Sequence, residues 1–303
     1  MFEIKNFVIS LMDKIEFPEN AKPTFIDAID TITKNENHLL LFKNIITEYD
    51  KTENCGYGEM LEKAKGIGKE LGVHEYTISL LLFLCLSPKL YERYIKKGLS
   101  PDLFYHTLKD LTYKLNECRL LYGIDGSFVA PWFQGFFNLT RFALGRLQFE
   151  YYSTRYEYVF NGKTMPVGSK VVNMHIPRTG TKLDHNEVLE SYRMAEEMFA
   201  DKFSPEPVIF LCDSWLLDPE IPSFLRPDSN LTLFQKDFTI VMTGESRVYS
   251  ALWTVFDREV TGDISVLPAD TSLRKAYIER IKNNKPFYYG HGLFLYKNGK
   301  IIK

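Results

Sequence analysis

The chain has 303 residues, of which 45% are hydrophobic and 25% are charged, and its formal net charge is −2 at pH 7. This length accommodates two domains with buried cores, and the composition is that of a globular protein rather than a disordered one. Because there is no overall positive charge, no nucleic-acid partner is expected, and any anion has to be bound by local basic residues.

The first 122 residues show helical periodicity, with apolar residues recurring three and four positions apart. Pro88 is expected to end the fifth predicted helix, because proline has no backbone N–H to donate and its ring clashes with the preceding turn. Pro101 instead suits the first turn of a helix that follows Ser100. The predicted helices cover residues 2–15, 25–32, 38–49, 60–71, 77–86 and 101–122.

Three features of the sequence bear on where the protein works. The longest apolar run, residues 78–86, is too short to cross a bilayer, so we expect a buried helix and no membrane partner. The N-terminus lacks the basic flank and small-residue cleavage site of a signal peptide. The cysteines are far apart and form no C-x-x-C pair, which favours reduced thiols in a cytoplasmic protein. They are Cys55, Cys85, Cys118 and Cys212.

The pattern changes at residues 123–127, which we interpret as the joint between a helical domain, residues 1–124, and a second domain, residues 125–303. Strands that first run antiparallel and are then joined through a helix predict a mixed sheet with flanking helices, so the expected fold class is α+β. The expected strands are residues 145–152, a hairpin of 156–160 and 165–176 around Asn161-Gly162, and then 208–212, 238–243 and 293–296, with helices at 219–225 and 272–283.

Residues 171–203 are the most informative stretch, because an apolar strand is followed by a polar turn around Gly180 and then by an amphipathic helix from Asp184. Turn N–H groups, the helix N-terminus and the cations of Arg178 and Lys182 can all face one anion. Asp184 with Glu187 resembles a capping box, so the turn amides are expected to bind more than the helix end does. The alternative is a solvated turn whose glycine only relieves backbone strain.

Six segments of the second half carry a family resemblance: residues 144–150, 175–177, 213–217, 228–231, 270–273 and 290–292. They resemble the GNAT-like C-terminal domain of a two-domain family of bacterial N-acyltransferases. The helical first half is similar to that family's N-terminal domain by pattern. The resemblance implies an acyl-CoA-dependent N-acyltransferase, with CoA lying where two neighbouring parallel strands separate.

The resemblance also implies a binding turn for the co-substrate, acetyl-CoA or another acyl-CoA. The family's usual pyrophosphate loop is R/Q-x-x-G-x-G/A, whereas residues 178–182 contain a single glycine. The fold inference does not depend on this loop. The residues expected to contact CoA are Ile176, Arg178, Thr179, Gly180, Thr181 and Lys182.

Two residues are candidates for the base that deprotonates an attacking amine. His175 closes a strand whose end lies near the thioester in a GNAT-like fold, and the alternative is a packing histidine. Glu150 shares a strand face with Gln148 and Arg146, and its alternative is a buried ion pair with Arg146.

Ser214, Trp215 and Asn230 are candidate substrate contacts, since the first two follow the central strand, where α/β sheets place ligands. Ser214 is suited to hydrogen-bond substrate or pantetheine, and Trp215 either lines an acyl pocket or belongs to the core. Cys212 ends an apolar strand and is expected to be inert. The six histidines show no metal-ligand spacing, so no metal is expected.

The leading hypothesis is an enzyme that moves an acyl group, with acetyl expected, from acyl-CoA to the amine of a small molecule or peptide by direct attack. Catalysis would come mainly from positioning, with the thioester carbonyl polarised by a strand amide. One alternative is a non-catalytic sensor of CoA or a nucleotide, and another is an interaction module with a GNAT-like sheet and no ligand. The sequence leaves the acceptor, the acyl chain length, the general-acid tyrosine and the oligomeric state open.

Overall fold

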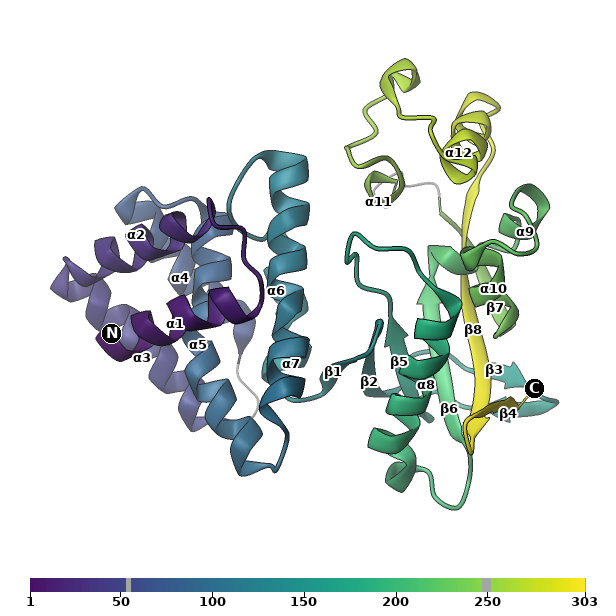
Figure 1. Ribbon diagram of the computed structural model, residues 1–303, viewed down its shortest axis with the longest axis horizontal. Helices are drawn as coiled ribbons and strands as arrows, with labels where there is room; N and C mark the ends of the chain where they lie inside the picture. The colour runs from purple at the N-terminus through teal and green to yellow at the C-terminus, as the bar shows by residue number, and fades with distance from the viewer. Residues whose placement is uncertain (53–55, 247–251, 303) are drawn as a thin grey trace. The chain divides into compact units, whose positions relative to one another are not determined.

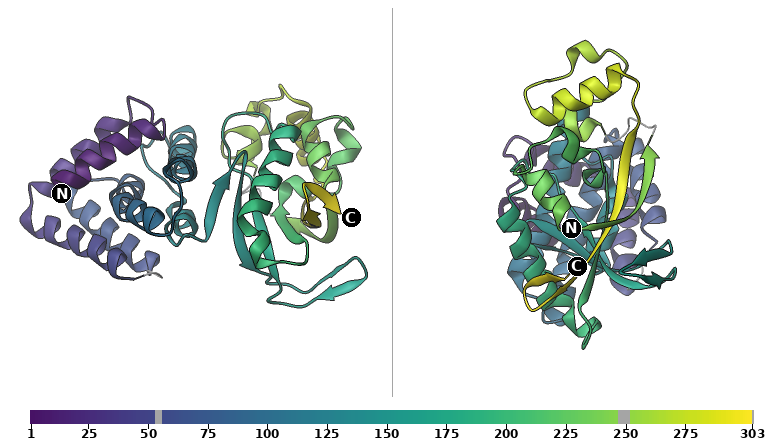
Figure 2. Two further views of the ribbon diagram at one scale, coloured as in Figure 1. Left: turned by 60° about the horizontal axis from the view of Figure 1, so that its bottom comes forward. Right: turned by 90° about the vertical axis from the view of Figure 1, so that its right-hand side faces the viewer.

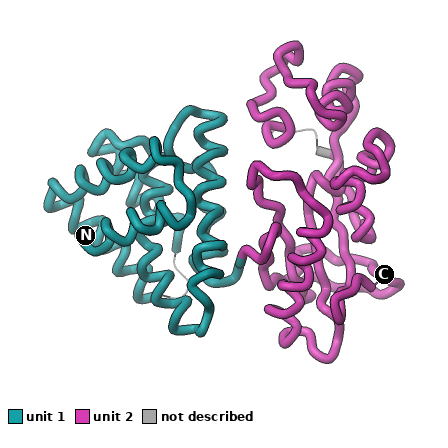
Figure 3. Tube along the Cα trace, viewed as in Figure 1, with its two compact units in different colours: residues 1–142 teal, residues 143–303 magenta. Residues whose placement is uncertain are grey.

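The computed structural model describes residues 1–52, 56–246 and 252–302. The chain separates into two compact units, Met1–Phe142 (unit 1) and Ala143–Lys303 (unit 2), as Figure 3 shows. Unit 1 is helical, and unit 2 is built on a mixed sheet with flanking helices (Figure 1). The α+β class expected from the sequence is therefore confirmed.

All six helices predicted for the first half are present in unit 1. Helix α5 forms its centre, where Ile78 and every residue from Leu80 to Leu86 are 0% exposed, so the longest apolar run is a buried helix. The helices are α1 (Phe2–Lys14), α2 (Lys22–Thr33), α3 (Glu36–Lys51), α4 (Tyr57–Leu71), α5 (Glu75–Lys96) and α6 (Pro101–Tyr122), followed by η1 (Ala130–Phe133) and α7 (Gln134–Phe137).

Helix α5 does not end before Pro88, so that prediction is wrong. The helix continues through the proline to Lys96. The Ser87 hydroxyl donates a hydrogen bond of 2.8 Å to the Phe83 carbonyl, one turn before. Leu90 and Tyr94, beyond the proline, are 0% exposed. Burial of this last part of the helix outweighs the loss of one backbone hydrogen bond.

The segment that we interpreted as the joint, residues 123–127, lies within unit 1, and the division falls 18 residues after residue 124, at Phe142/Ala143. Ser127 N–H donates to the Tyr76 carbonyl at 3.0 Å, and the Thr77 hydroxyl donates to the Asp125 carbonyl at 2.7 Å. A Cβ at Gly126 would lie 2.3 Å from the Tyr76 carbonyl carbon. This glycine therefore allows a close approach of two backbone segments rather than a hinge.

The central sheet of unit 2 has the strand order β1-β2-β5-β6-β8-β7, with β9 paired to β8. Strands β5 and β6 are parallel, whereas β2 with β5 and β6 with β8 are antiparallel. The strands are β1 (Arg141–Leu144), β2 (Leu147–Ser153), β5 (Lys170–His175), β6 (Val208–Ser214), β7 (Thr239–Ser246), β8 (Phe287–Lys297) and β9 (Lys300–Ile302).

The predicted hairpin is present, but its second strand is shorter than expected. Strands β3 (Tyr158–Phe160) and β4 (Lys163–Met165) pair around Asn161-Gly162, whose φ angles of 50° and 71° suit a tight hairpin turn. Residues 170–175, expected to extend this hairpin, instead form β5 and pair with β2 in the central sheet. Sequence periodicity identifies a strand but not its partner, so this part of the prediction is wrong.

The two faces of the sheet are covered differently. Helix α8 (His185–Phe199) covers one face, where the Tyr192 ring lies 5.8 Å from Phe210 and 4.9 Å from Phe294. The β3–β4 hairpin packs on the other face, with Tyr158 in a cluster that includes Leu211 and Leu293. Figure 2 shows α8 and the hairpin on opposite sides of the strands. Alternate residues of each strand therefore face either α8 or the hairpin side.

Short helices complete unit 2. The predicted helices at residues 219–225 and 272–283 are present as α9 (Ile221–Phe224) and α12 (Ser272–Lys282), whereas α10 (Asn230–Lys236) and α11 (Trp253–Phe256) were not foreseen. The expected last strand is part of the eleven-residue β8, which lies inside the sheet. Among the described residues of this unit, the 3₁₀ turns are η2 (Ala200–Lys202), η3 (Trp215–Leu217) and η5 (Ile264–Val266).

The described cysteines, Cys85, Cys118 and Cys212, are buried free thiols, as expected, and Cys55 lies outside the described residues. In the portion of the chain that the structure describes, none of the helices combines the length and the apolar character that crossing a bilayer requires.

Candidate functional site

The candidate site begins where strands β5 and β6 part. Their parallel ladder has three partner pairs, and the last is Met174–Cys212. Beyond that pair, β5 stays bonded to β2 through His175–Gln148, and β6 stays bonded to β8 as far as Ser214. Strand β5 therefore follows β2 and strand β6 follows β8, so the two parallel strands move apart. This is the separation of parallel strands that the family resemblance implies.

Both candidate bases lie beside this separation. Register pairs His175 with Gln148 and Glu150 with Asn173, so these side chains share one face of the sheet. His175 Nε2 lies 3.4 Å from Glu150 Oε2, and the two side chains are only 19% and 17% exposed. Glu150 Oε2 and Asn173 Nδ2 both lie 3.4 Å from His175 Nε2, so this ring nitrogen has one acceptor and one amide donor beside it. A histidine beside a carboxylate is the arrangement in which a candidate base is oriented for catalysis.

The turn after β5 is held at both ends by one arginine. Arg146, just before β2, donates from Nη1 to the Pro177 carbonyl at 3.0 Å and from Nε to the Lys182 carbonyl at 3.5 Å. Its own backbone N–H donates to the Ser191 hydroxyl on α8 at 2.8 Å. Arg146 therefore fixes the turn relative to both the sheet and the helix, a contact that the sequence analysis did not anticipate.

Two backbone amides of the turn are available for an anion. Thr179 N–H donates to the Pro177 carbonyl at 3.1 Å, and Thr181 N–H donates to the Thr179 hydroxyl at 3.3 Å. The N–H groups of Gly180 and Lys182 make no hydrogen bond to any of the described residues. Gly180 has a φ of 82°, which favours glycine, and the space around it is open.

The N-terminus of α8 is capped from within the chain. The Asp184 carboxylate accepts from the N–H groups of Asn186 at 2.9 Å and Glu187 at 3.3 Å, which confirms the predicted N-cap. Two of the amides that a helix offers to an anion are thus already bonded, and the carboxylate adds a negative charge. The turn amides and the turn cations remain as the candidate groups for binding an anion.

Of the two turn cations, one is paired and one is exposed. The Arg178 guanidinium contacts one oxygen of Asp257, whose other oxygen accepts from Arg274 Nη2 at 2.6 Å. Arg274 also pairs with Asp270 at 2.8 Å, so the positive charges of two arginines are balanced by the negative charges of two carboxylates. Lys182 is exposed and makes no ion pair with the described residues. Lys182 is thus open to an incoming anion, whereas Nη2 of Arg178 is already paired with Asp257.

The residues after β6 serve the local structure. The Ser214 hydroxyl accepts from Leu216 N–H at 3.1 Å and so caps η3, although its own proton can still be donated. The Trp215 ring packs 6.2 Å from Tyr277, edge-on, against a cluster built around α11 and α12. Both residues lie next to the strand separation, with Trp215 half-buried in a packed cluster.

Asn230 and Cys212 make no contact with His175 or Glu150 among the described residues. Asn230 begins α10, whose N-cap is Ser229, and no contact joins it to the other candidate residues among the described residues. Cys212 is 0% exposed, and burial raises the pKa of its thiol well above the ordinary value. The thiol is therefore protonated and shielded, as the sequence analysis expected.

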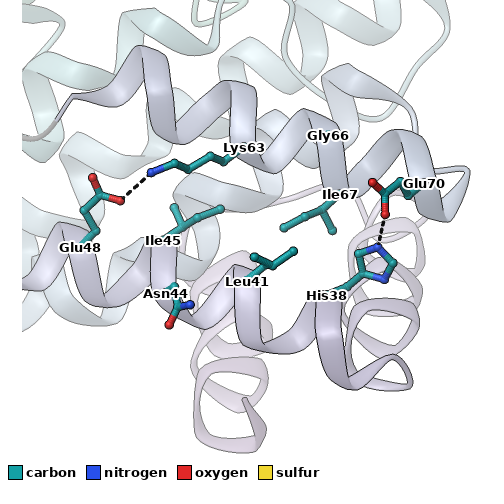
Figure 4. Close-up of a pocket in the computed structure, with 9 residues that line it drawn as sticks. All are labelled: His38, Leu41, Asn44, Ile45, Glu48, Lys63, Gly66, Ile67 and Glu70. Carbon is teal, nitrogen blue, oxygen red and sulfur yellow. Dashed lines mark hydrogen bonds and ion pairs between the residues drawn. The ribbon is translucent and has the colours of Figure 1, made fainter.

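A groove of about 340 Å³ lies between α3 and α4 in unit 1 (Figure 4). A His38–Glu70 hydrogen bond of 2.6 Å and a Lys63–Glu48 ion pair of 3.2 Å flank it, and apolar residues such as Leu41 line it. It contains none of the candidate residues and lies outside the unit that holds the strand separation, so it is not part of this site.

Comparison with protein families gives two matches, which together span nearly the whole chain. The model described as a GNAT-like C-terminal domain matches residues 141–294, and the model described as an N-acyltransferase N-terminal domain matches residues 6–139. The chain belongs to the two-domain GNAT-like N-acyltransferase family. The expected family and class of enzyme, an N-acyltransferase, are confirmed, and the two matched regions meet close to the division between the units.

Solved structures of acyltransferases share this fold. One, in complex with decanoyl-CoA and teicoplanin, is 20% identical, with a TM-score of 0.73 over 95% of this chain and 87% of its own. Another, with decanoyl-CoA, is 20% identical, with a TM-score of 0.74 over 94% and 86%. A mutant with octanoyl-CoA is 20% identical, with a TM-score of 0.72 over 94% and 86%. Comparison with curated proteins gives no significant match.

Two of the family segments meet behind the site. A Cβ at Gly290 would lie 2.5 Å from the Leu217 carbonyl oxygen, and one at Gly292 would lie 2.8 Å from Leu217 Cδ1. The Gly-His-Gly segment of β8 therefore lets η3 pack directly on the sheet. The two glycines of this motif therefore allow close packing of the chain. The sequence alone did not distinguish this role from the close approach of a ligand.

Proposed function

We propose that this N-acyltransferase moves an acyl group from acyl-CoA to an amine by direct attack of the amine on the thioester. The observation that carries the proposal is the His175–Glu150 pair, 3.4 Å apart, beside separating parallel strands and directly before a turn with two available amides. A base and an anion-binding turn on the same strand end are what such a reaction needs.

In this proposal the turn binds the diphosphate of CoA. The N–H groups of Gly180 and Lys182 and the Lys182 ammonium provide the first contacts, and Arg178 joins once phosphate replaces Asp257. Thr179 and Thr181 offer hydroxyls that at present bond to each other at 2.8 Å. The pantetheine arm then enters between β5 and β6, where the N–H of Ile176 is suited to polarise the thioester carbonyl.

One base takes part in the proton transfers of the proposed reaction. An amine arriving as ammonium gives a proton to the His175 imidazole, and Glu150 stabilises the imidazolium that forms. The free amine attacks the thioester carbonyl, so a C–N bond forms and the C–S bond breaks. The second amine proton is lost as CoA leaves and its thiolate is protonated. The balance is ammonium plus acyl-CoA giving amide, CoA thiol and one proton, with no metal required.

We propose a small-molecule or peptide amine as the acceptor, and Ser214, Trp215 and Asn230 as further substrate contacts. The acyltransferases of similar fold carry decanoyl-CoA or octanoyl-CoA, and one also carries teicoplanin. Acetyl-CoA, the donor expected from the sequence, therefore needs to be compared with longer donors. A cytoplasmic location fits the free thiols of the three described cysteines.

The test is thiol release from a donor series, acetyl-, butyryl-, octanoyl- and decanoyl-CoA, in the presence of a panel of primary amines. We expect amine-dependent release with at least one donor and an amide product of the matching mass. Binding of CoA, measured by calorimetry, separates the alternatives. Binding without release from any donor supports a sensor, and the absence of both supports an interaction module.

A further inference from the structure

A second polar cluster lies on the same face of the sheet as the His175–Glu150 pair. Tyr158 Oη on β3 lies 2.8 Å from His291 Nδ1 on β8, and His291 Nε2 lies 3.6 Å from Asp213 Oδ1 on β6. Asp213 and His291 are register partners in the β6–β8 ladder. The hairpin, which the central sheet does not need for its pairing, thus delivers the tyrosine to this histidine.

Burial decides which atoms carry protons in this cluster. Tyr158 and His291 are 3% and 2% exposed, whereas the Asp213 side chain is 53% exposed. Burial lowers the pKa of His291, with Asp213 opposing, and desolvation raises the pKa of Tyr158 to about 12. At neutral pH the imidazole is therefore neutral and the phenol protonated.

The cluster runs from a buried tyrosine, through a buried histidine, to an exposed carboxylate. Tyr158 Oη and His291 Nδ1 lie within hydrogen-bond distance, and the other ring nitrogen, Nε2, faces the Asp213 carboxylate. At 3.6 Å the histidine–aspartate contact is electrostatic rather than a hydrogen bond. Two buried side chains thus lie behind one carboxylate that remains open to solvent.

Asp213 lies across the strand separation from His175. It is the first β6 residue after the last parallel pair, Met174–Cys212, and its strand alternation places it on the same face as Leu211, the partner of Asn173. His175 follows Asn173 by two residues and shares that face. A carboxylate and a base are therefore placed on the two sides of the gap where the thioester is proposed to lie.

We propose that Asp213, positioned by His291 and Tyr158, binds the ammonium form of the acceptor amine beside His175. This inference rests on the proposed acyl transfer and names the acceptor class as cationic amines. An exposed carboxylate attracts the ammonium, and the base across the gap removes its proton before attack. Tyr158 and His291 are positioning residues, because they act through Asp213.

The test compares two acceptors of nearly equal shape, phenethylammonium, which is a cation at neutral pH, and O-benzylhydroxylamine, which is neutral. Asp213→Asn should raise the KM for phenethylammonium by about tenfold or more, as expected for loss of a charged hydrogen bond, with little change in kcat. KM for O-benzylhydroxylamine should not change. Tyr158→Phe should act in the same direction but less strongly, and Asp201→Asn, an exposed carboxylate on η2, is the matched control.

Two results overturn the proposal, namely equal effects of Asp213→Asn on both acceptors, or no effect on either. A second measurement does not depend on turnover. With CoA present, phenethylammonium should shift the side-chain NMR signals of His291 in the wild type and in Asp201→Asn, but not in Asp213→Asn. No shift in the wild type overturns the ammonium site, whereas a shift without acyl transfer to any amine retains it and overturns the proposed function instead.

Discussion

At the scale of single residues, the account depends on His175 and Glu150. Strand alternation in the sequence places each of them on a polar face, but only the β2–β5 register brings their side chains to 3.4 Å. The sequence could therefore propose two bases, and the proposed function treats them as one base and the carboxylate that orients it. A partner 25 residues away on another strand leaves no local signal in the sequence.

We predict that His175→Ala lowers kcat by about a hundredfold or more, within the range of general base catalysis. Glu150→Gln should lower it less, because the imidazole keeps a hydrogen-bond partner but loses the opposing charge. CoA affinity measured by calorimetry should be unchanged in both variants, since neither residue belongs to the turn. Full turnover in both variants would refute the assignment of the base.

The turn cations give a second prediction. Lys182→Ala and Arg178→Ala should each weaken CoA binding by about tenfold, the usual effect of one charged contact. Asp257→Asn should tighten binding, because it removes the carboxylate that competes with phosphate for Arg178. Arg193→Ala, an exposed arginine on α8 that pairs with Glu190 and Glu197, is the control. Unchanged affinity in the first two variants would place the diphosphate elsewhere.

At the scale of elements, most helices and strands could be predicted from periodicity, and the failures have physical causes. Helix α5 passes through Pro88 because burial of the residues after it outweighs one lost hydrogen bond. Strand β5 was joined to the wrong partner, since alternation gives a face but no neighbour. The Asp257 contact to Arg178 spans 79 residues, so no spacing rule could predict it.

The cap of α8 can be tested as a structural element. Asp184→Ala should lower the free energy of unfolding by about 1 kcal/mol, since the N–H groups of two residues lose their acceptor. CoA affinity should stay the same or rise, because a carboxylate near the turn is removed. Urea denaturation and calorimetry measure the two quantities. A loss of CoA affinity in a folded variant would show that Asp184 supports the ligand rather than the helix alone.

At the scale of the whole molecule, the strand separation, the turn and both polar clusters all lie in unit 2. The three tryptophans allow this to be tested, because Trp132 belongs to unit 1 and Trp215 and Trp253 belong to unit 2. In single-tryptophan variants, the fluorescence of Trp215 reports the unfolding of unit 2. CoA at a hundred times its dissociation constant should raise the free energy of unfolding of this unit by about 2.7 kcal/mol. Stabilisation seen by Trp132 alone would place the ligand in unit 1.

The most direct test is a crystal structure of the protein with CoA bound. We predict density for the diphosphate against the N–H groups of Gly180 and Lys182, with Arg178 released from Asp257 and the pantetheine arm between β5 and β6. CoA bound in the groove between α3 and α4, or a turn left unchanged with the Arg178–Asp257 pair intact, would contradict the account.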